Sequence, residues 1–163
     1  HVLNPHVPDL GAGRQFAADG VHCETNDSTA QLQMDIAPAY PAAAKVKSWL
    51  RTVRLNRGRN VEIIEAFELA ETVGDTTLTF LTPLEADTSQ PRQVTLRTVP
   101  QSGQRPVRVR LEYDPTKLAS SVERLELSDG RLAKSWGTHL NRLVLRAKSS
   151  ALKDAWTLRV TQE

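Results

Sequence analysis

Cysteine is nearly absent from this sequence, because Cys23 is the only one among 163 residues. A single thiol excludes an internal disulfide, and it also excludes a cysteine-based zinc cluster. The histidines are few as well, at positions 1, 6, 22 and 139, and they show no HxH, HxxxH or HExxH spacing. A self-contained zinc site is therefore not expected from this sequence.

Long apolar runs are also missing. No stretch approaches the roughly 18 residues that a membrane-spanning helix needs, and the start has no signal-peptide pattern, so we expect no membrane partner. The net charge is only +2 and aromatic residues make up 5 % of the chain, which leaves few stacking platforms and argues against a nucleic-acid partner. Because the chain begins at His1 rather than methionine, we expect a processed chain or a piece of something longer.

Catalytic motifs are absent too. The sequence has no GxSxG element, Cys/His pairing, P-loop or dinucleotide-binding glycine motif. Its carboxylates, such as Glu62, Glu68 and Glu123, mostly alternate with apolar residues, as they do on solvated strand faces. No complete set of acid, base and charge-neutralising groups can be assembled, so an independent enzyme is the least favoured interpretation.

Alternation of apolar and polar residues is the dominant pattern. In "TAQLQMDI" the apolar residues Leu32, Met34 and Ile36 alternate with polar ones, which predicts a strand with one buried face. Turn signals separate further strand-like segments, which read "TTLTFLT", "QVTLRTV", "VRVRLEY", "VERLELS", "HLNRLVLR" and "AWTLRVT". About ten short strands cannot all lie in one flat sheet without large exposed faces. We therefore predict an all-β fold, an antiparallel two-layer β-sandwich.

The predicted sandwich has an irregular beginning. Residues 1–13 are rich in proline and glycine and have little periodicity, so we interpret them as an extended N-terminal arm left from a preceding segment. Residues 14–163 are predicted to form a single β-sandwich domain.

The stretch "KSWLRTVRLNRGRNVEI", residues 47–63, reads as a tight hairpin. Its turn is "NRGRN", in which Gly58 can adopt a positive φ. Arg51 shares a strand face with Trp49 and Val53, so we expect it to be structural and to need a buried partner.

Arginine is preferred over lysine, with 15 Arg against 6 Lys. The guanidinium group binds carboxylate and sulfate in a bidentate manner, so this preference points weakly to an anionic ligand. Arg57 and Arg59 lie at the tip of the predicted hairpin, and Arg108 and Arg110 share the polar face of "VRVRLEY". These four residues are the candidate polyanion-binding residues.

The hairpin region resembles the C-terminal part of the heparinase II/III-like polysaccharide lyases. Those proteins carry a stretch of the form "AYP…W.R.V.L.RG..V.I", and this sequence matches it from Ala39 to Leu69. The later segment "LEYDPTKLASSVERLELSDGRLAKSWGTHLNRLVL" resembles the family ending, with its "L.YD" and "D..L...WG..L.R" elements. The resemblance covers roughly residues 11–160.

The resemblance implies a longer parent enzyme with a helical toroid followed by β-sandwich layers. Such an enzyme would cleave uronic-acid-containing polysaccharide by β-elimination, with catalytic Tyr and His residues upstream of this segment. It would also imply a zinc-like divalent metal in the parent, for which His1 is the nearest candidate ligand, while no cofactor is expected in this chain itself. A periplasmic or secreted location follows from the resemblance alone.

Two functional hypotheses remain. In the first, the chain is a C-terminal, non-catalytic domain that braces the preceding catalytic region, and it should then expose an apolar or mixed patch where that partner packs. In the second, it is an acidic-glycan-binding module that uses its surface arginines.

Overall fold

The computed structural model describes residues 16–98 and 106–163, and the predicted arm at residues 1–13 lies outside them. Eight strands form the larger sheet, in the order β1-β2-β3-β4-β11-β8-β7-β6, and each neighbouring pair is antiparallel. Their bounds are β1 (Asp19–Thr25), β2 (Thr29–Asp35), β3 (Val46–Asn56), β4 (Asn60–Leu69), β6 (Glu85–Asp87), β7 (Gln93–Arg97), β8 (Arg108–Glu112) and β11 (Lys153–Gln162).

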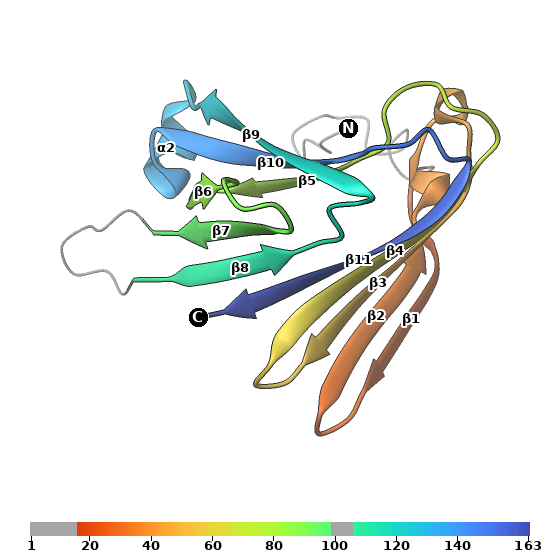
Figure 1. Ribbon diagram of the computed structural model, residues 1–163, viewed down its shortest axis with the longest axis horizontal. Coiled ribbons are helices and arrows are strands. Elements are labelled where there is room, and N and C mark those ends of the chain that lie inside the picture. Colours follow the sequence, from red (N-terminus) through yellow and green to blue (C-terminus); the bar gives the residue numbers. More distant parts are fainter. Residues whose placement is uncertain (1–15, 99–105) are drawn as a thin grey trace.

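A second, smaller sheet lies over part of the first (Figure 1). It has three antiparallel strands in the order β5-β10-β9, namely β5 (Thr77–Thr82), β10 (His139–Ala147) and β9 (Leu118–Glu126). The helical elements are short: the 3-10 turns η1 (Ala37–Ala39) and η2 (Ala42–Ala44), and the α-helix α2 (Gly130–Trp136). Among the described residues, no helix reaches the length and hydrophobicity needed to cross a membrane.

The predicted fold class is confirmed: the chain is a two-layer antiparallel β-sandwich. The described residues contain eleven strands rather than about ten. The edge strands β1 and β6 and the helix α2 are additions that the alternation pattern did not predict.

The core fills the space between the two sheets. Leu143 and Leu145 of β10 are fully buried, and so are Val94 of β7 and Leu158 of β11, which come from the other sheet. The alternation of side chains along each strand directs these residues into one cluster, because successive residues point to opposite faces. Each sheet thus buries one face against the other.

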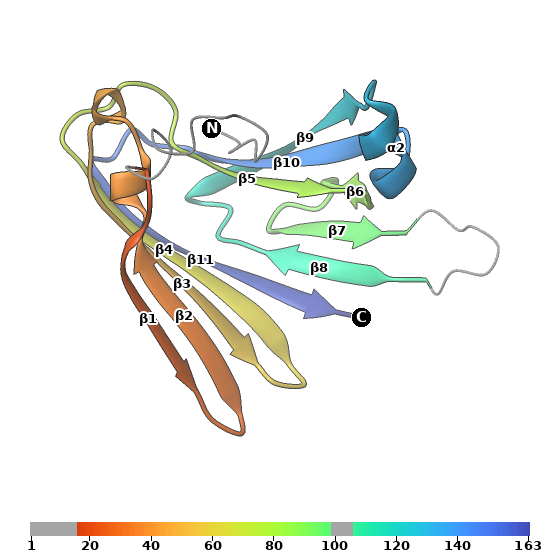
Figure 2. The ribbon, with the colours of Figure 1, turned by 180° about the vertical axis from the view of Figure 1, so that it is seen from behind.

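Coverage of the large sheet is incomplete. β1 to β4 continue beyond the small sheet, and Figures 1 and 2 show their ends, with the connecting turns, projecting away from it. The β3–β4 hairpin follows the prediction, with Asn56 opposite Asn60 and Gly58 at φ 70° in the turn. Only glycine adopts this backbone conformation without a steric cost.

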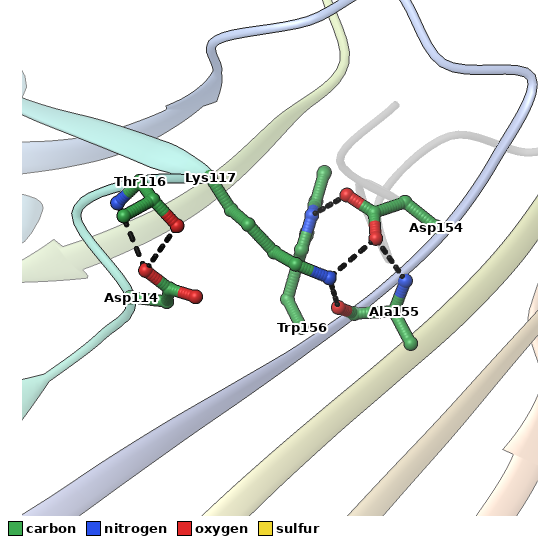
Figure 3. Close-up of polar contacts among 6 residues, drawn as sticks. All are labelled: Asp114, Thr116, Lys117, Asp154, Ala155 and Trp156. Carbon is green, nitrogen blue, oxygen red and sulfur yellow. Dashed lines mark hydrogen bonds and ion pairs between the residues drawn. The ribbon is translucent and has the colours of Figure 1, made fainter.

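A polar network joins the β8–β9 connection to β11 (Figure 3). The Lys117 ammonium donates to Asp154 Oδ1 at 2.6 Å and to the Ala155 carbonyl oxygen at 2.9 Å. The Trp156 indole N–H donates to the second oxygen of Asp154 at 2.9 Å. Asp154 therefore fixes both the connection and the Trp156 ring, which lies in the core.

Candidate functional site

The projecting end of the large sheet carries apolar side chains on its inner face. Leu32, Val53, Leu55 and Val61 lie on the same face as the core residues, but they are not part of the core cluster. Leu55 is 38 % exposed. We call these four residues the apolar end.

The apolar end borders a hollow of about 660 Å³. Leu55 and Val61 line one side of it and Val160 and Val109 line another. Leu55 is exposed and the other three aliphatic side chains are partly buried, and clustered apolar surface of this kind is typical of interaction sites. The apolar end therefore combines one exposed leucine with three partly buried aliphatic side chains at the edge of the hollow.

A buried ion pair between Arg51 and Glu65 lies on the same face of β3 and β4, two residues along each strand from Val53 and Ile63. Glu65 is 1 % exposed and accepts two hydrogen bonds, from Arg51 Nε at 2.7 Å and from the Trp49 indole N–H at 2.6 Å. The predicted structural role of Arg51 is thus confirmed, and Glu65 is its buried partner. The pair locks β3 to β4 at the boundary between the covered core and the apolar end.

Aromatic rings stiffen the same boundary. The Trp49 and Phe67 rings are stacked with centroids 5.0 Å apart, and Phe67 meets Trp156 edge to face at 4.9 Å. Offset stacked and edge-to-face pairs are the favoured aromatic geometries. The apolar end is therefore next to a packed cluster of the Trp49, Phe67 and Trp156 rings.

The outer face of the large sheet is polar and mostly charge-paired. Glu62 lies between Arg159, at 3.1 Å, and Arg54, at 3.6 Å, and Arg54 also donates to the Gln31 side chain. The hydrogen bond from Arg159 is the main reason that the pKa of Glu62 lies below its usual value. On β2, β3, β4 and β11 these polar side chains are therefore paired with one another, unlike those of the apolar end.

The two predicted arginines of the hairpin tip differ from one another. Arg57 donates to the Asn26 carbonyl oxygen at 3.3 Å and to the Thr25 hydroxyl at 3.1 Å, so it joins the β3–β4 turn to the β1–β2 turn. Arg59 is exposed, lines the hollow beside the apolar end, and forms no ion pair within the described part of the chain. The Arg59 guanidinium is therefore more accessible to an anionic ligand than that of Arg57.

The other predicted pair, Arg108 and Arg110, lies on the outer face of β8. Both contact the Glu163 carboxylate, at 2.8 Å each. Arg97 of β7 is directly opposite Arg108, so three guanidinium groups share this part of the sheet. Glu163 also lines the hollow that Arg59 borders at the hairpin tip. Arg97 was not among the predicted polyanion-binding residues, because its position opposite Arg108 depends on the pairing of β7 with β8.

The candidate metal ligand His1 lies outside the described residues. Within residues 16–98 and 106–163, no group of three or more His, Cys, Asp or Glu side chains could hold a metal ion. The described residues therefore supply no complete metal site.

Comparison with known proteins gives a structural match only. No family model matches the sequence, and no curated protein matches it. The structure is similar to that of the heparan sulfate lyase HepC from Pedobacter heparinus, with a TM-score of 0.61 and 14 % identity, over 89 % of this chain. It is also similar to a heparinase III, the BT4657 gene product, with a TM-score of 0.60 and 12 % identity, over 90 % of this chain.

These similarities confirm, at the level of the fold, the heparinase resemblance expected from the sequence. In both cases the match covers only 21 % of the solved chain, so this chain spans about a fifth of the length of the structures it resembles.

Proposed function

We propose that this chain is a non-catalytic β-sandwich domain of a heparinase-like polysaccharide lyase and that it braces the catalytic region of a longer protein. The parent would cleave uronic-acid-containing polysaccharide, and the domain would follow its catalytic region. No group of three or more His, Cys, Asp or Glu among the described residues could hold a metal ion, and we assign no chemical step to this domain.

The apolar end is the observation that carries this proposal. Leu32, Val53, Leu55 and Val61 face the same side as the core, yet the small sheet does not cover them. Full burial of one exposed aliphatic side chain contributes about 1.5–3 kcal/mol. Leu55 is 38 % exposed and the other three are partly buried, so a partner that covered all four would gain part of that amount from each. The similarity to chains about four times as long supports the idea that the partner is another part of the same protein.

A charge placed in the apolar end tests the proposal. In the full-length protein, Leu55→Asp should weaken the packing of this domain, lowering both the thermal midpoint and the lyase activity. Leu81→Asp is the matched control, because Leu81 is 58 % exposed on the outer face of the small sheet. In the 163-residue chain alone, both variants should unfold at nearly the parent temperature. Equal effects of the two variants on the full-length protein would contradict the proposal.

A second candidate function is acidic-glycan binding by the arginines. Arg97 and Arg108 are directly opposite each other across β7 and β8, and like charges in this arrangement are destabilising. The Nε atom of Arg110 is buried without a hydrogen-bond partner and lies 3.9 Å from Glu112, whereas the Nη1 atom of the same side chain pairs with Glu163 at 2.8 Å. Glu163 already offsets part of the charge of Arg108 and Arg110, and an anionic group bound beside β7 and β8 would add a second negative charge next to the three guanidinium groups.

Charge reversal distinguishes this function from the first. Replacement of Arg59, Arg108 and Arg110 by Glu should abolish retention of the chain on immobilised heparin at low salt. Arg124→Glu on β9, which breaks an exposed pair with Glu126, serves as the control. Unchanged retention of the triple variant would dismiss the glycan-binding function.

A further inference from the structure

The helix α2 is unusually exposed for its composition. It has seven residues and no buried side chain, yet it presents Leu132 at 48 % exposure and Trp136 at 51 % exposure. The other two tryptophans, Trp49 and Trp156, are buried in the core. Tryptophan is highly buried on average, so an exposed indole needs an explanation.

Trp136 lines a hollow of about 560 Å³ between α2 and the loop before β6. Lys134, Ser135, Thr138 and His139 also line it. Thr98 lines it as well, so the hollow combines one flat aromatic ring with an ammonium group, an imidazole and three hydroxyl groups. Small-molecule sites are typically concave surfaces of this size with a few polar groups.

The walls of the hollow are held in place. The Asn141 side chain is buried and donates to the Leu84 carbonyl oxygen at 2.9 Å, which fixes the loop side. His139 Nε2 lies 3.4 Å from a Glu85 carboxylate oxygen. On the helix side, the backbone turns into β10 at Gly137, whose φ of 89° favours glycine. The site is therefore formed before any ligand arrives.

We propose that this hollow binds a six-membered sugar ring that carries a carboxylate or sulfate group. The apolar C–H face of the sugar would stack on the Trp136 indole. Lys134 forms no ion pair within the described residues, so its ammonium is available for the acidic group. Ser135 and Thr138 would exchange hydrogen bonds with the sugar hydroxyls. This site uses none of the residues of the apolar end or of the arginine cluster.

Fluorescence quenching tests the site directly, because Trp136 is the only one of the three tryptophans that is exposed. The probe is a sulfated, uronate-containing heparin tetrasaccharide, added to the 163-residue chain, with acrylamide as the neutral quencher. The tetrasaccharide should protect the emission from acrylamide. Trp136→Ala should weaken its binding by about tenfold in calorimetry, a loss consistent with removal of one stacked aromatic contact.

Two further variants make the test specific. Lys134→Ala should weaken binding of the acidic tetrasaccharide but should not alter binding of the neutral cellotetraose. Leu132→Ala is the matched control, since Leu132 lies one helical turn before Trp136 and does not line the hollow. Its affinity should equal that of the parent chain.

The proposal is overturned if Trp136→Ala binds the tetrasaccharide as tightly as the parent chain does, or if Leu132→Ala loses as much affinity. It is also overturned if the tetrasaccharide gives no protection from acrylamide. Because the experiment uses the 163-residue chain alone, its failure would not affect the bracing function, and failure of the bracing function would not affect this site.

Discussion

Replacement of Glu65 by Ala tests how the large sheet is held together at the base of the apolar end. Glu65→Ala removes the acceptor of two hydrogen bonds, leaving the Trp49 indole N–H and the Arg51 guanidinium without their partner. Breaking a buried ion pair typically costs about 3–5 kcal/mol. Arg51 is 34 % exposed and can regain some hydration, so we expect the lower part of this range, about 3 kcal/mol.

The assay is urea unfolding followed by circular dichroism, together with thermal unfolding. For a chain of this size, about 3 kcal/mol corresponds to a fall in the melting temperature of about 10 °C. The matched control is Glu68→Ala on the same strand. Glu68 is half-exposed and pairs with Lys47 and Lys153, so its loss should cost less than about 1 kcal/mol.

A double variant separates the charge from the packing. In Arg51→Met/Glu65→Leu no buried charge is left alone, so stability should recover by at least about 1 kcal/mol relative to Glu65→Ala. A cost below about 1 kcal/mol for Glu65→Ala, or no difference between the two Glu variants, would refute the role of the buried pair.

Two other predictions concern stability. Burial alone would raise the pKa of the Asp154 carboxyl, but the hydrogen bonds from Lys117, the Ala155 amide and Trp156 outweigh this effect and lower it. A lowered native pKa contributes stability that is present above the unfolded value of about 4 and is lost as the pH falls through the native value. Urea unfolding of Asp154→Asn should therefore depend less on pH below about 4 than that of the parent chain, and parallel curves would contradict this. Gly58→Ala should cost about 1 kcal/mol, because the turn needs a positive φ although the space around Gly58 is open; an unchanged urea midpoint would show that the turn relaxes.

The sequence was informative wherever one sheet face is buried. The alternation in "TAQLQMDI" and in the hairpin predicted β2, β3 and β4, because a period of two is what a half-buried strand requires. β6 has only three residues, which is too short to show a period. The helix α2 has no buried side chain, so it leaves no amphipathic pattern that could have identified it.

The candidate sites were predictable only in part. The face shared by Arg51 and Trp49 correctly implied a buried partner, which is Glu65. The proximity of Arg97 to Arg108 depends on the pairing of β7 with β8, and the hollow at Trp136 depends on how α2 sits beside β10. Long-range register and packing of this kind cannot be read from local sequence patterns.

Amide hydrogen exchange of the β3–β4 hairpin, compared between the 163-residue chain and the full-length protein, tests the bracing function most directly. The account predicts that amides from Val53 to Val61 exchange at least about tenfold more slowly in the full-length protein, because a packed partner suppresses local opening of the projecting strands. Amides of β9 in the small sheet serve as the internal reference. Equal exchange of the hairpin in the two proteins would contradict the claim that the apolar end is covered by another part of the same chain.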